Sequence, residues 1–113
     1  MKNDSKKAKA RYLQNLVRDR ICKLFPKLGP DDIRTSLMSE NGADVKLTSL
    51  TARKLFAYSI ETKNREDYKT IYNAFTQASR HTNQEPLLVI KMNRKKPLAI
   101  IDMEHFFKLQ EDE

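Results

Sequence analysis

The sequence has few of the residues on which several common kinds of functional site depend. Among its 113 residues there are two glycines, one cysteine, two histidines and no tryptophan. With glycine only at positions 29 and 42, there is no Gly-rich phosphate loop of the Walker or dinucleotide type. No His/Cys cluster has zinc-ligand spacing, and no Ser-His-Asp or Cys-His pattern stands out. Nucleotide-binding, zinc-dependent and triad-based functions are therefore not predicted.

The lone cysteine and the lack of a long apolar run bear on the cellular location of the protein. Cys22 cannot form an internal disulfide, which fits a reducing compartment. No stretch approaches 18 consecutive apolar residues, and the basic N-terminus lacks the apolar core of a signal peptide. We therefore expect no membrane segment and a cytoplasmic location.

Charge is what the sequence has in abundance. It holds 22 basic and 15 acidic residues, a net charge of +7, and three of the acids are the last three residues. An excess of this kind favours a polyanionic partner, because binding releases counterions from phosphates. The length predicts one domain: a basic flexible arm over residues 1–9, a single domain over 10–110 and an acidic tail over 111–113.

The order of the apolar patterns predicts an α/β fold. Helices are predicted over about 10–25, 67–82 and 103–109. Strands are predicted over 31–39, 44–48, 55–63, 86–92 and 97–102, with a hairpin turn at 40–42 and a short turn or helical piece at 49–54. The segment 86–92 is apolar on both faces, which is typical of a buried parallel strand reached by a right-handed crossover. The expected architecture is a mixed central sheet of about five strands flanked by helices.

Two of the predicted strands carry residues that suit a small polar site. Asp44 begins one strand, and Glu61 and Lys63 share one face of the next because side chains alternate. Two carboxylates suit a hard divalent cation such as Mg²⁺, and a nearby lysine can orient a water or offset charge on a phosphate. The alternative is an ordinary aspartate at the start of a strand and a surface ion pair.

The same residues resemble a known signature. Asp44 followed by Glu61-x-Lys63 resembles the D…(D/E)xK pattern of the PD-(D/E)XK nuclease superfamily. Further segments resemble small phage-type nucleases that are similar to archaeal Holliday junction resolvases: 36–38, 41–44, 52–53, 58–64, 77–78, 86–91 and 97–100. The resemblance covers about residues 12–108. It implies a restriction-endonuclease-like fold and a Mg²⁺-dependent, structure-specific DNA endonuclease, located in the host cytoplasm if the chain is phage-encoded.

The resemblance also implies roles for individual residues. Asp44 and Glu61, with the main-chain carbonyl of Thr62, are expected to hold one or two Mg²⁺ ions, for which Mn²⁺ can substitute. Lys63 is expected to steady the attacking water and the developing charge.

Two glutamines complete the expected catalytic set. Many relatives carry an acidic residue on the first helix, and here Gln14 takes that place, with Asn15 and Asp19 as alternatives. Gln77 is expected near the active centre; its alternative is a solvated glutamine on a helix.

Eight cations are expected to contact the DNA backbone, which positions the nucleic acid without reading its sequence. They are Arg11, Arg18, Arg20, Arg53, Lys91, Arg94, Lys95 and Lys96. Two symmetric cuts in a four-way junction need two sites, so a homodimer is expected, with Phe106 and Phe107 as interface material. Two alternatives stay open: a nicking, flap or exonuclease activity in repair or replication, and a non-catalytic basic DNA-binding protein on a nuclease-like scaffold.

Overall fold

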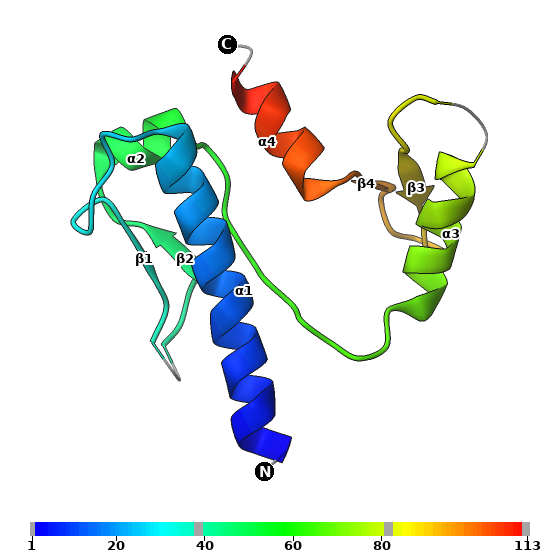
Figure 1. The fold of residues 1–113 in the computed structure, drawn as a ribbon, viewed down its shortest axis with the longest axis horizontal. Coiled ribbons are helices and arrows are strands. Elements are labelled where there is room, and N and C mark those ends of the chain that lie inside the picture. Colours follow the sequence, from blue (N-terminus) through cyan, green and yellow to red (C-terminus); the bar gives the residue numbers. More distant parts are fainter. Residues whose placement is uncertain (1, 38–39, 81–82, 112–113) are drawn as a thin grey trace. The chain divides into compact units, whose positions relative to one another are not determined.

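The computed structural model describes residues 2–37, 40–80 and 83–111, and these form helices and two small antiparallel sheets (Figure 1). The elements in chain order are α1 (Lys2–Leu24), β1 (Ile33–Thr35), β2 (Val45–Leu47), α2 (Leu50–Leu55), α3 (Lys69–Ser79), β3 (Leu88–Ile90), β4 (Leu98–Ile100) and α4 (Met103–Glu111). The chain divides into two compact units, unit 1 over Met1–Asn64 and unit 2 over Arg65–Glu113.

Unit 1 is a long helix packed on a β-hairpin. β1 and β2 pair antiparallel from Ile33↔Leu47 to Thr35↔Val45, and α1 contacts both strands. Val17 and Ile21 of α1 are buried together with Ile33 and Val45 of the hairpin. Burial of such a side chain stabilises the fold by about 1.5–3 kcal/mol, so these four residues are the main attachment between the helix and the hairpin.

The short helix α2 returns the chain to the hairpin. It begins at Ser49, whose hydroxyl accepts a hydrogen bond from the Ala52 backbone N–H at 3.0 Å. Ala52 within α2 and Phe56, the residue that follows the helix, are both buried. Beyond Phe56 the chain runs without regular structure to Ile60, which forms an isolated antiparallel bridge with Val45.

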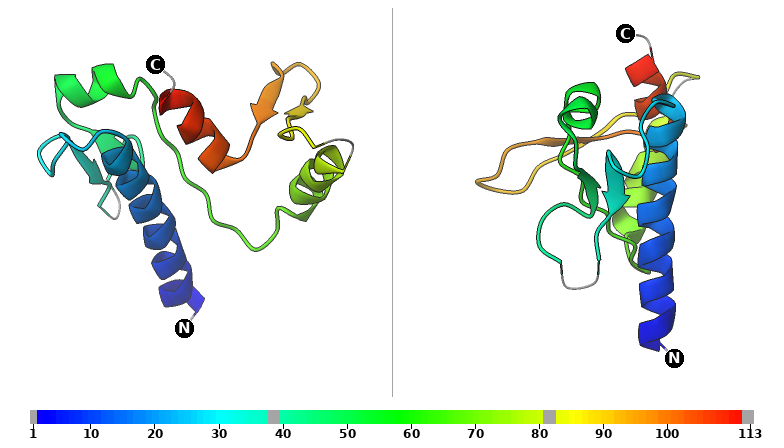
Figure 2. Two further views of the ribbon diagram at one scale, coloured as in Figure 1. Left: turned by 45° about the horizontal axis from the view of Figure 1, so that its top comes forward. Right: turned by 90° about the vertical axis from the view of Figure 1, so that its left-hand side faces the viewer.

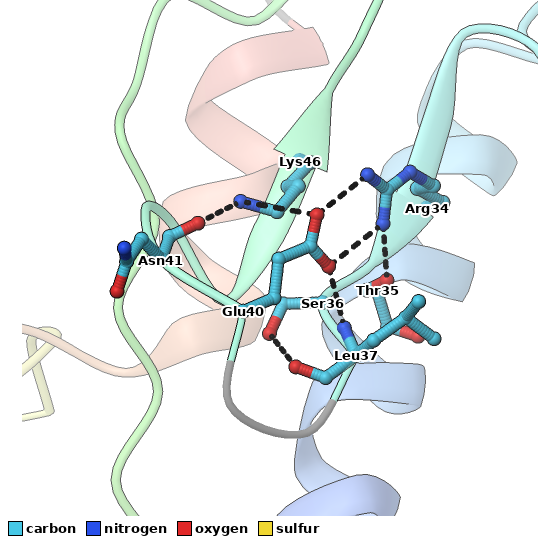
Figure 3. A network of polar contacts seen from close by, with 7 residues as sticks. All are labelled: Arg34, Thr35, Ser36, Leu37, Glu40, Asn41 and Lys46. Atoms are coloured by element: carbon cyan, nitrogen blue, oxygen red, sulfur yellow. Dashed lines mark hydrogen bonds and ion pairs between the residues drawn. The ribbon is translucent and has the colours of Figure 1, made fainter.

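A polar network closes the hairpin (Figure 3). Arg34 donates two hydrogen bonds to the Glu40 carboxylate, at 2.8 and 3.1 Å, and the same carboxylate accepts from the Leu37 N–H at 2.7 Å. Lys46 lies 3.9 Å from Glu40 and donates to the Asn41 carbonyl at 2.6 Å. These donors hold the pKa of Glu40 at about 2, below its usual 4.5, with the Arg34 hydrogen bond as the largest cause.

Unit 2 is a second hairpin with a helix beside it. β3 and β4 pair antiparallel from Leu88↔Ile100 to Ile90↔Leu98, and α3 contacts β3. In the connecting turn the Lys95 N–H donates to the Met92 carbonyl at 3.0 Å, and Arg94 adopts a left-handed conformation with φ 67°. α4 follows β4, and the carboxylate of Asp102, the residue before the helix, accepts a hydrogen bond from the His105 N–H at 2.9 Å.

The prediction of a restriction-endonuclease-like fold with a mixed central sheet of about five strands was wrong. The described residues contain two separate two-stranded sheets and no mixed five-stranded one. The segment 86–92 is not a buried parallel strand, because the short turn at 91–97 joins β3 directly to its antiparallel partner. Leu87 and Val89 are 56% and 59% exposed. Of the predicted strand over 55–63, Leu55 belongs to α2, and the remaining residues contribute one isolated bridge, at Ile60.

Other boundaries also differ from those predicted. α1 begins at Lys2, so residues 2–9 of the predicted flexible arm are helical. The boundary between the two compact units falls after Asn64, inside the predicted domain over 10–110. The predicted antiparallel hairpin is present, although its strands are shorter than predicted and residues 36–44 connect them instead of a turn at 40–42. A helical piece near 49–54 and a helix from Met103 are present as predicted. Residues 38–39 of the first predicted strand, 81–82 of the second predicted helix and 112–113 of the acidic tail lie outside the described residues.

The low pKa of Glu40 gives a prediction for acid stability. A carboxylate whose pKa is lowered by folding stabilises the folded state above its unfolded pKa, and this contribution is lost as the pH falls from about 4.5 toward 2. Glu40→Gln should therefore flatten the dependence of the urea midpoint on pH across this range, followed by far-UV circular dichroism. Asp31→Asn, which removes an exposed carboxylate of the same unit, is the control. An equal flattening in both variants would contradict the role of Glu40.

Candidate metal and nucleic-acid site

The backbone of Asp44 is held between two segments of unit 1. Its N–H donates to the Ile60 carbonyl at 2.8 Å, and its own carbonyl accepts from the Ser36 N–H at 2.8 Å. Asp44 immediately precedes β2, so the hairpin and the bridge at Val45 and Ile60 fix its position from both sides.

The Asp44 side chain makes a further contact with the returning segment. Its Oδ2 atom accepts from the Thr62 backbone N–H at 2.7 Å and from the Thr62 hydroxyl at 3.4 Å. The carboxylate is half-buried, and in the described part of the chain its Oδ1 atom accepts no hydrogen bond. One oxygen therefore holds the returning segment in place and the other is available to a ligand.

Glu61 and Lys63 flank Thr62 at the surface. The Lys63 Nζ lies 3.4 Å from the Glu61 Oε2, and the side chains of Lys63 and Glu61 are 56% and 63% exposed, respectively. An exposed pair of this kind contributes about 0–1 kcal/mol, so it is easily rearranged. The structure thus brings Asp44 together with the segment that carries Glu61, Thr62 and Lys63.

The available ligands can be set against the needs of a magnesium ion. The described residues include no group of three or more His, Cys, Asp or Glu side chains placed to hold a metal. Asp44 and Glu61 supply two carboxylates on neighbouring segments. Mg²⁺ is commonly held by one or two carboxylates and completed by waters and substrate phosphates. Asp44 and Glu61 are therefore the two carboxylates that a metal site at this segment would use, and waters and phosphate oxygens would have to complete it.

The other residues expected in the catalytic set make no hydrogen bond or ion pair with Asp44 or Glu61 in the described part of the chain. Gln14 and Asn15 are half-buried on α1 and make no hydrogen bond to Asp44 or Glu61 within the described part of unit 1. Asp19 is exposed and paired with Arg18 at 2.9 Å. Gln77 is exposed on α3, in the other unit. A third acidic ligand from the first helix is therefore not found among the described residues.

The eight cations expected to contact DNA divide equally between the two units. Unit 1 holds Arg11, Arg18, Arg20 and Arg53, and unit 2 holds Lys91, Arg94, Lys95 and Lys96 around the turn between β3 and β4. The four in unit 2 and Arg11 are exposed. The Arg53 guanidinium donates to the Leu47 carbonyl at 3.0 Å, and Arg18 is paired with Asp19. Arg53 and Arg18 are thus already engaged by the fold.

Sequence reasoning missed the network around Glu40. In the register of the hairpin Arg34 lies directly opposite Lys46, and like charges in that position repel each other. Glu40 lies within reach of both and offsets the repulsion. The signal was present in the sequence, as two cations on facing strands and an acid beside the turn, but it becomes readable only when the register is known.

Comparison with protein-family models, with curated proteins and with solved structures gives no match for this chain. Over the described residues, each helix is too short or too polar to cross a lipid bilayer.

The double role of Asp44 gives a stability prediction. Asp44→Ala removes the acceptor of the half-buried Thr62 N–H and should lower the free energy of unfolding by about 1–2 kcal/mol. Asp44→Asn keeps a side-chain oxygen at that position and should retain most of this contribution. Urea denaturation of both variants and the unchanged chain measures the difference. Equal stability of all three proteins would show that the Thr62 contact does not hold the segment.

Proposed function

We propose that this protein is a Mg²⁺-dependent enzyme that hydrolyses DNA phosphodiester bonds. The observation that carries the proposal is the bond from the Thr62 N–H to the Asp44 carboxylate, which joins two residues 18 positions apart in the sequence. This bond sets one carboxylate beside a segment with a second carboxylate and a lysine. The proposal rests on this local arrangement and needs no five-stranded sheet.

The chemistry follows from the positions of these groups. Asp44 and Glu61 would hold Mg²⁺, with the Thr62 carbonyl as a further ligand. When bound, the ion supplies Lewis-acid polarisation of a phosphoryl oxygen. Glu61 could turn toward a bound ion at little cost, because its exposed pair with Lys63 contributes about 0–1 kcal/mol. The Lys63 ammonium would then be able to orient water and to offset negative charge on a phosphate in the transition state.

Branched DNA is the substrate that we propose. The exposed cations Arg11, Lys91, Arg94, Lys95 and Lys96 can contact phosphates, and such contacts position DNA without reading its sequence. Recognition by backbone contacts suits an enzyme selective for DNA shape. Two symmetric cuts in a four-way junction would need a homodimer, since each chain has one set of these residues.

A second candidate function is non-catalytic binding of nucleic acid. It is favoured by one observation: Glu61 and Lys63 already form an ion pair with each other, and Asp44 already serves as a structural acceptor. In that case the net charge of +7 alone would account for binding.

Cleavage assays separate the two candidates. Labelled junction, flap, single-stranded and linear duplex DNA are incubated with the protein in Mg²⁺ and in chelator. We expect Mg²⁺-dependent cutting that is lost in Asp44→Asn and Glu61→Gln and severely reduced in Lys63→Ala, while DNA binding is kept. Glu66→Gln, which removes a nearby exposed carboxylate, is the control and should cut normally. Binding without cutting of any of the four DNAs would favour the non-catalytic candidate.

The expected homodimer gives a separate prediction. Phe107 is 2% exposed, so it is not free to form an interface, whereas Leu87, Val89 and Met92 of unit 2 are 56%, 59% and 66% exposed. We expect light scattering with junction DNA to report a dimer, and Val89→Lys to weaken it by placing a charge in the contact. Leu50→Lys, at a 60% exposed position of unit 1, is the matched control. A monomer with and without junction DNA would move the substrate to flaps, nicks or single strands.

A further inference from the structure

The first turns of α1 are exposed on all sides. Each of residues 5–12 is exposed, whereas burial begins further along the helix, with Val17 and Ile21 in the core. Figure 2 shows these turns extending past the β1–β2 hairpin. We call residues 5–12 the helical arm. Its charged residues are all cations, namely Lys6, Lys7, Lys9 and Arg11.

The charges on the helical arm oppose its own helical structure. Lys6 and Lys9 are three residues apart and Lys7 and Arg11 four apart, so each pair of like charges lies on neighbouring turns. Such pairs destabilise a helix by amounts similar to the gain from an opposite-charge pair at the same spacing. A helical segment this short is marginal without packing. Neutralisation of the four cations by a polyanion would therefore stabilise the helix.

We propose that the helical arm is a docking surface for the phosphate backbone of duplex nucleic acid, and that binding stabilises its helix. The inference rests on the proposed function for its choice of DNA. An α-helix with side chains is about 10–12 Å wide and the major groove is about 12 Å wide. Eight helical residues extend about 12 Å, which matches three to four base pairs at about 3.4 Å each.

The composition of the arm favours nucleic acid over other anionic surfaces. Besides Ala8 and Ala10, its apolar residue is Tyr12, which is 68% exposed. A helix that lies in a lipid interface needs a continuous apolar face. A stable protein contact is usually anchored by a cluster of buried aromatic or apolar residues. The helical arm has neither a continuous apolar face nor a cluster of apolar anchors, so its cations are the groups that can bind a partner.

The arm also joins the candidate site. The side-chain amide of Asn64 donates to the Lys9 carbonyl at 3.4 Å, and Asn64 directly follows Lys63. The segment with Glu61 and Lys63 therefore meets α1 within the arm. A duplex held by Lys6, Lys7 and Lys9 would reach the residues proposed to act on its phosphates.

The test compares two variants that lose the same charge. Lys6, Lys7 and Lys9 are replaced by Gln in one, and the exposed Lys27, Lys69 and Lys108 in the other; Gln has nearly the helix propensity of Lys. Binding of a 20-base-pair duplex is measured against salt concentration, in chelator so that no cutting occurs. We expect the log–log slope of the arm variant to become shallower by up to about 2.7, at about 0.9 for each phosphate that is no longer neutralised. The slope of the other variant should stay close to that of the unchanged chain.

Amide hydrogen exchange tests the second half of the proposal. Residues of the arm should exchange more slowly when the unchanged chain binds the duplex, and this slowing should be absent in the arm variant. Equal slopes for the two variants, or no slowing of exchange in the bound arm, would overturn the proposal. Competition by a poly-glutamate peptide as effective as unlabelled duplex at equal charge would also overturn it, since the partner would then be an acidic protein.

These results are independent of cleavage. If the salt-dependence slopes of the two variants differ as expected and no DNA is cut, the proposal for the helical arm is supported and the catalytic proposal fails. If DNA is cut and the two variants bind alike, the catalytic proposal stands and the arm fails.

Discussion

The candidate site depends on one short contact, in which the Asp44 carboxylate accepts the Thr62 N–H. The segment after α2 has a single bridge to the hairpin, at Val45 and Ile60, and no ladder of strand hydrogen bonds among the described residues beyond it. A single bridge orders a chain weakly, because each backbone hydrogen bond contributes about 1 kcal/mol net. The carboxylate extends that bridge by one more bond. It is this bond that keeps the segment of Glu61 and Lys63 beside Asp44.

That contact in turn needs the hairpin to be in register, and the register places two cations opposite each other. Arg34 and Lys46 would push the strands apart if Glu40 did not lie within reach of both. Hairpin pairing thus depends on an acid in the connecting loop, near Gly42, which adopts a positive φ of 98°. The apolar side chains of Ile33 and Val45 are buried where the same hairpin meets α1.

Local patterns in the sequence predicted local structure, and they did not predict how strands combine. The segment 49–54 was predicted as a short turn or helical piece, and Asn41-Gly42 predicted a hairpin; the structure has α2 and an antiparallel hairpin there, because caps and turns are decided by neighbouring residues. The segment 86–92 was predicted as a buried strand, but burial is decided by distant partners, and beside β4 Leu87, Val89 and Met92 stay exposed while Leu88 and Ile90 are half-buried. For the site, spacing led to the expectation of Asp44 near residues 61–63, and the structure has the Thr62 N–H bonded to the Asp44 carboxylate without the strand on which that expectation was based. It could not place Gln14 or Gln77, since a helical residue's direction depends on packing.

Loss of activity on removal of the Asp44 carboxylate would not by itself establish that Asp44 is a metal ligand. Asp44 holds Thr62 with Oδ2, so a variant without an acceptor there loosens the segment that carries Glu61 and Lys63. Loss of cutting in such a variant would follow either from the absence of Asp44 as a ligand or from the displacement of Glu61. Glu61 has no comparable structural duty, because its partner in the described residues is the exposed Lys63. A change at Glu61 would therefore test the proposed chemistry more directly than a change at Asp44, although Asp44 is the residue on which the geometry depends.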